Sequence, residues 1–304
     1  MMSTLPPDRS HILTEQRNPR TMQLHELSAR ECVRLIAQED RAVLAALDNA
    51  GESLAAFIEA AECGFVAGGR LVYLGAGTSG RLGVLDASEA PPTFQVTPDR
   101  VVGIIAGGDG ALRKSSETKE DDPKGAWPEL EKLALNSNDA VIGIAAGGTT
   151  PYVLGAFAYT KSLAARPLTA MLSCSPVPKP DGADHLIVLE TGPEVITGST
   201  RMKAGTATKL ALNTISSTLM IRSGRVYENL MVDLRATNDK LRDRASRIVG
   251  TLTGLARPDA LALLDRAGGR VKVAVLMHRQ RVDAAEAERL LDAGGGRLDR
   301  ALRQ

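Results

Sequence analysis

Residues 71–89 read Leu-Val-Tyr-Leu-Gly-Ala-Gly-Thr-Ser-Gly-Arg-Leu-Gly-Val-Leu-Asp-Ala-Ser-Glu. The apolar start is typical of a buried strand, the small residues after it are typical of a turn, and the remainder has helical spacing. Glycines in such a turn permit tight backbone with positive φ, so several N–H groups can converge on a phosphate where the helix begins. Gly77, Thr78, Ser79 and Gly80 form the centre of the turn. The stretch therefore predicts an anion-binding loop in an α/β fold.

The same turn also matches a pattern of dinucleotide-binding proteins. Gly75, Gly77 and Gly80 satisfy G-x-G-x-x-G. Such a protein needs an acidic residue at the end of its second strand, roughly 20 residues after the glycines, to bind ribose hydroxyls. Asp109 is available for this role but comes late. A small phosphorylated ligand is therefore favoured, and a dinucleotide is the alternative.

Composition argues against several classes of partner. The 304 residues include 37 basic and 36 acidic ones, for a formal charge of +1, and only 3% are aromatic. Neither a nucleic acid nor a membrane surface is therefore expected as a partner. No stretch approaches the roughly 20 apolar residues of a membrane span, and the polar N-terminal segment lacks the features of a signal peptide. We expect a cytoplasmic protein.

Cysteine and histidine spacing gives no sign of a metal site. Cys32, Cys63 and Cys174 are odd in number and scattered, which favours reduced thiols over a disulfide framework. The four histidines lie far apart in the sequence, and none has the spacing of a metal ligand. No metal is expected, so proton chemistry would fall mainly to carboxylates.

Strand-like runs alternate with helical segments in the middle of the chain. Helix is expected in pieces from a capping box at Ser28 to about residue 67, and again over 199–223, where Gly224 would end it. The alternation predicts a parallel sheet covered on both faces. The expected strands are 70–74, 101–106, 140–145, 168–173 and 185–189.

The C-terminal part is expected to form a small helical bundle. Residues 263–271 and 290–298 share one pattern, a Leu-Leu-Asp helix end followed by glycines. Helix termination explains these glycines better than ligand binding does, and two copies are too few for a solenoid.

Two further loops resemble the first in composition. Residues 144–151 place Thr150 as the N-cap of a helix and Pro151 as its first residue, and residues 192–203 bring hydroxyls and cations to another helix start. Each loop alone is better explained as a helix cap. Three such loops at the carboxyl ends of parallel strands together predict a site for one small phosphorylated ligand.

Carboxylates follow the first two predicted strands. Asp86 and Glu89 lie three residues apart on the helix after the first loop, so they share a face close to any bound phosphosugar. Glu120 begins a Glu-Asp-Asp run, which by itself is usually a solvated helix start. Spacing alone does not pair Glu120 with Glu89.

Several long motifs of this chain resemble the bacterial N-acetylmuramic acid 6-phosphate etherases. The resemblance covers nearly the whole chain and implies a three-layer α/β/α sugar isomerase (SIS) domain with a parallel sheet, an N-terminal helical segment and a small C-terminal helical bundle. The implied boundaries are 1–60 for the N-terminal arm and helices, 61–224 for the SIS domain, and 225–304 for a UBA-like helical domain. The motifs are residues 15–20, 75–89, 91–94, 103–109 and 192–203.

The resemblance also implies a reaction. These enzymes cleave the ether of N-acetylmuramic acid 6-phosphate with water to N-acetylglucosamine 6-phosphate and D-lactate, during cell-wall recycling. They work as homodimers with sites near the subunit interface, and no cofactor is implied. The rival interpretation is a non-catalytic phosphosugar sensor, because the glucokinase regulatory proteins share the Gly-Pro-Glu-x-x-Thr-Gly-Ser-Thr-Arg stretch.

Matching motifs residue by residue places the two active-site carboxylates of the family at Glu89 and Glu120. We assign Glu89 as the acid that protonates lactate and Glu120 as the base that activates water, and leave open which step removes the sugar proton. An acid that acts near neutral pH needs burial or a negative neighbour, and Asp86 is the nearest candidate. The predicted substrate-binding residues are Gly77, Thr78, Ser79, Gly80, Gly148, Thr150, Glu194, Ser199 and Lys203.

The chain departs from the family in its second loop. Where relatives usually have Ser-Gly-Arg-Thr or a similar run, this sequence has Gly147-Gly148-Thr149-Thr150, which lacks one hydroxyl and one cation. A lost hydrogen bond to a charged group is worth roughly 1.5–3 kcal/mol, so weaker phosphate binding is expected unless Thr149 or water compensates.

Overall fold

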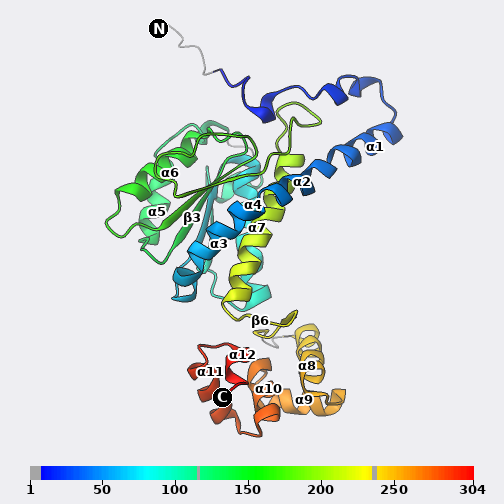
Figure 1. Ribbon diagram of the computed structural model, residues 1–304, viewed down its shortest axis with the longest axis vertical. Helices are drawn as coiled ribbons and strands as arrows, with labels where there is room; N and C mark the ends of the chain where they lie inside the picture. Colours follow the sequence, from blue (N-terminus) through cyan, green and yellow to red (C-terminus); the bar gives the residue numbers. More distant parts are fainter. Residues whose placement is uncertain (1–7, 115–116, 235–237) are drawn as a thin grey trace. The chain divides into compact units, whose positions relative to one another are not determined.

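The computed structural model describes residues 8–114, 117–234 and 238–304. The chain divides into two compact units (Figure 1). The first consists of Met1–Ser88 and Pro98–Ser216, and the second of Glu89–Thr97 and Ser217–Gln304. The division predicted at residues 60 and 224 stays a prediction.

The first unit is built on a five-stranded parallel sheet. Its strand order is β2-β1-β3-β4-β5, and the two central strands β1 and β3 are buried along their whole length. The predicted parallel sheet and α/β fold class are confirmed. The strands are β1 Leu71–Gly75, β2 Val101–Ile105, β3 Ala140–Ile144, β4 Leu168–Ser173 and β5 His185–Val188.

Helices cover both faces of this sheet, with α5 and α6 on one face and α3, α4 and α7 on the other (Figure 1). The α-helices of this region are α1 Ala29–Glu39, α2 Arg41–Asn49, α3 Gly51–Val66, α4 Gly77–Phe94, α5 Trp127–Leu133, α6 Pro151–Ser162 and α7 Lys203–Arg222. Short 3-10 helices are η1 Leu13–Glu15, η2 Pro19–Thr21, η3 Leu24–Glu26, η4 Asp109–Leu112 and η5 Glu117–Lys119.

Helix α4 packs against the sheet at a distance that only glycine permits. A Cβ at Gly103 would lie 2.6 Å from Cα of Val84, so β2 must have a glycine there. The Asp86 carboxylate is buried and accepts hydrogen bonds from the Tyr73 hydroxyl (2.9 Å) and from Nδ2 of Asn213 (2.7 Å). Asp86 therefore ties α4 to β1 and to α7.

The helix boundaries test two of the sequence predictions. The capping box is confirmed, because the Ser28 hydroxyl accepts from the Glu31 N–H while the Glu31 carboxylate accepts from the Ser28 N–H. The predicted start of the long helix at Ser199 is wrong, since α7 begins at Lys203. The Glu194 carboxylate accepts hydrogen bonds from the N–H groups of Lys203 (3.0 Å) and Ala204 (2.9 Å) and so caps the helix there.

The second unit is a helical bundle, as predicted. Both repeated glycine pairs have positive φ, and the N–H groups of Gly269 and Gly296 return to the carbonyls of Leu264 and Leu291. Both pairs therefore terminate helices. The elements are the hairpin β6 Val226–Tyr227 and β7 Leu230–Met231, then α8 Asp239–Thr253, α9 Arg257–Arg266, α10 Val271–Gln280, α11 Ala284–Ala293 and α12 Leu298–Ala301.

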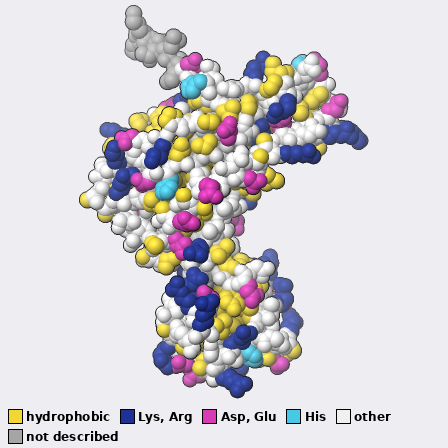
Figure 2. Space-filling model, in the orientation of Figure 1, with side chains coloured by type: hydrophobic (Ala, Val, Ile, Leu, Met, Phe, Trp, Pro, Cys, Tyr) yellow, Lys and Arg dark blue, Asp and Glu magenta, His cyan; other side chains and the backbone are white. Residues whose placement is uncertain are grey.

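The surface carries both signs of charge. On the face drawn in Figure 2, Lys and Arg side chains are interspersed with Asp and Glu side chains, in keeping with the formal net charge of +1. Over the part of the chain that the structure describes, no helix is long and apolar enough to cross a membrane.

Candidate active site

A cavity of about 190 Å³ lies beside the carboxyl ends of β1 and β3. This edge of an open α/β sheet is where ligands usually bind. All three loops predicted to bind a phosphorylated ligand line this cavity, together with residues of the N-terminal segment. Five of the predicted site residues line it: Gly77, Thr78, Ser79, Glu120 and Thr150.

The first loop presents the start of α4 to the cavity. Gly77 has a φ of +52°. A Cβ at Gly80 would lie 2.6 Å from the Gly75 carbonyl oxygen, so this position requires glycine, although Gly80 itself does not line the cavity. The free N–H groups of the first helical turn and the hydroxyls of Thr78 and Ser79 thus lie together where an anion would bind.

The second loop presents the start of α6. Thr150 occupies the N-cap position and Pro151 is the first helical residue, as predicted, but the Thr150 side chain makes no capping hydrogen bond. Its hydroxyl is therefore available to a ligand. Gly148 has a φ of +74°, packs against Val177, and lines a neighbouring, mostly apolar cavity instead.

The third loop contributes Gly198 and Thr200 to the lining of the cavity. Glu194 is fully buried and caps α7, and burial raises the pKa of its carboxyl. Lys203 is also fully buried, and its Nζ donates to Glu39 at 3.1 Å. Neither these two residues nor Ser199 lines the cavity, so their binding roles stay predictions.

Glu39 joins the N-terminal segment to the third loop. Its carboxylate accepts hydrogen bonds from Nδ2 of Asn18 (2.7 Å), from Nζ of Lys203 (3.1 Å) and from the Arg20 guanidinium. The Asn18 amide also donates to the Pro193 carbonyl at 3.3 Å. Two motifs that are about 175 residues apart in the sequence, 15–20 and 192–203, are therefore held together by one ionic cluster, in which Glu39 and Lys203 are buried and Arg20 is exposed.

Replacing Glu39 by glutamine is expected to lower the free energy of unfolding by about 3–5 kcal/mol, because the buried Lys203 ammonium would lose its counter-charge. Urea unfolding at pH 7 measures this loss. Glu59→Gln, at an exposed glutamate of α3, is the matched control and should unfold like the wild type. Equal midpoints for Glu39→Gln and the wild type would contradict the prediction.

The same cluster predicts a dependence of stability on pH. The Arg20 guanidinium, with Asn18 and Lys203, lowers the pKa of Glu39 from 4.5 to about 2. The pKa of Glu39 is lower in the folded state than in the unfolded state. The stabilisation of the fold by the ionised Glu39 carboxylate is therefore complete above pH 4.5 and is lost as the pH falls toward 2. The difference in the free energy of unfolding between the wild type and Glu39→Gln should therefore decrease as the pH falls from 4.5 to 2. A difference that stays constant over this pH range would contradict the prediction.

The two predicted catalytic carboxylates have different positions. Glu120 lines the cavity, and its carbonyl accepts from the Tyr152 N–H in the first turn of α6 at 3.0 Å, which places it beside Thr150. Glu89 lies on an exposed face of α4, about three turns after Gly77, and does not line the cavity. Asp86 is buried against other partners.

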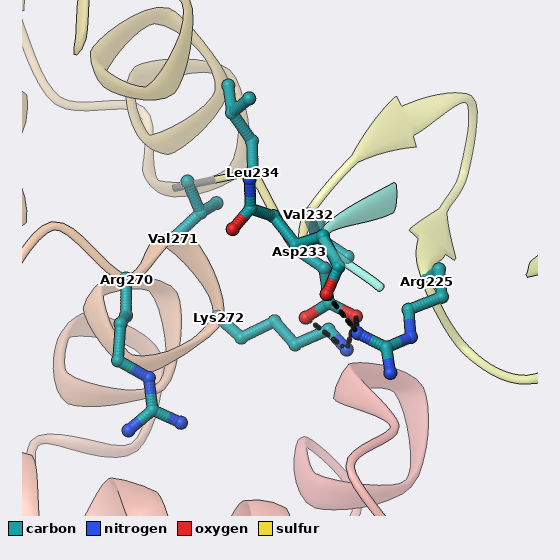
Figure 3. A pocket seen from close by; sticks show the side chains of 8 residues that line it. Arg225, Val232, Asp233, Leu234, Arg270, Val271 and Lys272 are labelled. Atoms are coloured by element: carbon teal, nitrogen blue, oxygen red, sulfur yellow. Dashed lines mark hydrogen bonds and ion pairs between the residues drawn. The ribbon is translucent and has the colours of Figure 1, made fainter. Parts of the chain in front are cut away.

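A second polar cavity, of about 320 Å³, lies within the second unit (Figure 3). Asp233 accepts from Nζ of Lys272 at 2.8 Å and forms an ion pair with Arg225 at 3.3 Å, while Arg270 is paired with Glu288. Each of the three cations therefore has a carboxylate partner, and these ion pairs explain the cluster as structural. In the described residues, no group of three or more His, Cys, Asp or Glu side chains could hold a metal ion.

Known proteins resemble this chain along nearly its full length. An N-acetylmuramic acid 6-phosphate etherase of Gloeobacter violaceus is 51% identical over 97% of this chain and 96% of its own length. One of Bacillus licheniformis is 44% identical over 97% of this chain and 98% of its own. The chain belongs to the N-acetylmuramic acid 6-phosphate etherase family.

Two further comparisons cover less of this etherase-family chain. The model of the glucokinase regulatory protein N-terminal SIS domain matches residues 53–161. A solved structure of a putative sugar-phosphate isomerase from Listeria monocytogenes is 17% identical, with a TM-score of 0.44 over 64% of this chain and 92% of that one.

Sequence reasoning missed three polar residues that line the cavity, Thr200, Arg9 and Glu15. Thr200 stands in a loop that was already expected at the site, as does Thr149, which the sequence offered as a compensating phosphate contact and which also lines the cavity. Arg9 and Glu15 come from the N-terminal segment, and Glu15 opens one of the motifs shared with the etherases. That motif was the available signal, but only the folded chain shows that the segment reaches the three Gly, Ser and Thr-rich loops.

Proposed function

We propose that this protein cleaves the lactyl ether of N-acetylmuramic acid 6-phosphate with water, giving N-acetylglucosamine 6-phosphate and D-lactate. The observation that carries the proposal is the cavity in which Glu120 lies with the hydroxyls of Thr78, Ser79 and Thr150 at two helix starts. Helix N-termini with hydroxyl donors suit a phosphate, and a carboxylate beside them can act as a base. The similarity to etherases along the chain supports the same substrate.

The chemistry gives each glutamate a role. In the open-chain sugar, the aldehyde acidifies the adjacent C–H bond, so a base can take that proton while an acid protonates the departing lactate oxygen. The C–O bond breaks and leaves an unsaturated aldehyde. Water then adds to the double bond, with one proton removed by a base and one returned to carbon. Glu120 is the proposed base, and Glu89 is the proposed acid for lactate.

A non-catalytic sensor of the glucokinase regulatory type is the less favoured function. The matching SIS model covers residues 53–161 alone, whereas the etherase relatives match 97% of the chain. Both glutamates that the reaction needs are also present.

We propose that the protein works as a homodimer. We also propose that it acts in the cytoplasm, as an enzyme of cell-wall recycling. Leu85 is 48% exposed and lies four residues before the exposed Glu89, so both occupy one face of α4. An exposed leucine beside a functional carboxylate suits a face that a second subunit covers. Light scattering of the purified protein measures the subunit number.

The direct test is incubation of the purified protein with N-acetylmuramic acid 6-phosphate, followed by an enzymatic assay for D-lactate. We expect equal amounts of D-lactate and N-acetylglucosamine 6-phosphate without added metal or cofactor. Unphosphorylated N-acetylmuramic acid is the control and should react much more slowly, because the phosphate loops would have no group to bind. Absence of lactate under any condition would refute the etherase function.

A further inference from the structure

The charge balance of the candidate site singles out one residue of the N-terminal segment. Among the described residues that line the cavity, Glu15 and Glu120 are the acidic ones and Arg9 is the basic one. The other polar side chains there are hydroxyls, and the loop over 147–150 adds no charged group. Among the described lining residues, Arg9 is therefore the one cation that a phosphate entering this cavity would meet.

Helix starts alone do not balance the charge of a phosphate dianion. The N-terminus of an α-helix carries about half a positive charge, which falls off within its first turn. Two helix starts, those of α4 and α6, thus offer about one positive charge to a phosphate dianion. A full positive charge is needed beside the phosphate, and a guanidinium binds phosphate through two parallel hydrogen bonds.

The backbone around Arg9 is fixed to the walls of the cavity. The Arg9 carbonyl accepts from the Ile12 N–H at 2.9 Å, and the Ile12 carbonyl accepts from the Glu15 N–H at 2.9 Å. Thr14 anchors this turn to two other loops, because its N–H donates to the Ser175 hydroxyl at 3.3 Å and its carbonyl accepts from the Gly198 N–H at 3.2 Å. The turn is thus held against the loop after β4 and against the third phosphate loop.

We propose that Arg9 binds the phosphate group of the substrate and sets the preference of the site for a phosphorylated sugar. The proposal rests on the proposed function of this cavity as a phosphosugar site. In this proposal, Arg9 of the N-terminal segment supplies the cation that the second loop lacks. Arg9 binds the substrate and takes no part in proton transfer.

Titration calorimetry of the full-length protein with N-acetylglucosamine 6-phosphate and with N-acetylglucosamine tests this role. Arg9→Gln should weaken binding of the phosphorylated sugar about 10- to 100-fold, the range expected for a lost charged hydrogen bond, and leave the unphosphorylated sugar unaffected. Arg9→Lys should recover part of the loss. Arg17→Gln, at an exposed arginine of the same segment, is the matched control and should bind both sugars like the wild type.

Turnover gives a second readout. With N-acetylmuramic acid 6-phosphate, Arg9→Gln should raise KM by a similar factor and leave kcat nearly unchanged, because the proposed proton-transfer groups are intact. Unchanged affinity for the phosphorylated sugar, or an equal loss for both sugars, would overturn the proposal. If the wild type binds the phosphorylated sugar but releases no lactate, the etherase function fails, while the calorimetric comparison still decides the role of Arg9.

Discussion

Replacing Glu120 by glutamine is expected to lower kcat for D-lactate release by about 10²- to 10⁴-fold, the usual contribution of a positioned acid or base. Glu120 lines the cavity and is fixed to the first turn of α6, so the amide would keep its place but could not accept a proton. KM should change little. Steady-state assays of D-lactate measure both constants, and Glu131→Gln, at an exposed glutamate of α5, is the control.

Deuterium exchange separates the two steps assigned to this residue. In D₂O, a base that takes the sugar proton also allows deuterium to enter at the carbon next to the aldehyde. If Glu120→Gln loses both exchange and lactate release, Glu120 takes the sugar proton. If lactate is still released in a single turnover while the unsaturated aldehyde accumulates, Glu120 activates water alone. Normal turnover of Glu120→Gln would show that the cavity base is another group.

Replacing Glu89 by alanine is expected to reduce lactate release to a similar extent, about 10²- to 10⁴-fold, through loss of the acid that protonates the leaving group. Affinity for N-acetylglucosamine 6-phosphate should remain at the wild-type value, since Glu89 does not line the phosphate cavity. Calorimetry and the lactate assay on the same preparation test this separation. Glu131→Ala is the matched control.

Two results would contradict the role of Glu89. A variant that turns over normally would remove the proposed acid from the mechanism. A variant that loses phosphosugar affinity together with activity would show that Glu89 supports the binding site. Unfolding midpoints near that of the wild type are expected for Glu89→Ala, because the side chain is exposed.

Much of the fold follows from local patterns in the sequence. The capping box at Ser28 and the proline after Thr150 mark helix starts that the structure confirms, because these signals act between residues a few positions apart. The start of α7 was predicted four residues too early. It depends on the Glu194 carboxylate, whose reach to Lys203 and Ala204 belongs to a loop conformation that spacing does not reveal.

The sequence by itself determined the parallel sheet, the three Gly, Ser and Thr-rich loops and the family, because each of these depends on short-range pattern or on long motifs. Only the tertiary structure decided which polar groups share a cavity. It brings Arg9 and Glu15 to the loops that contain Thr78 and Thr150, and it directs Lys203 to Glu39. The physical reason is that buried hydrogen bonds and ion pairs join segments far apart in the sequence, and no local pattern specifies their partners.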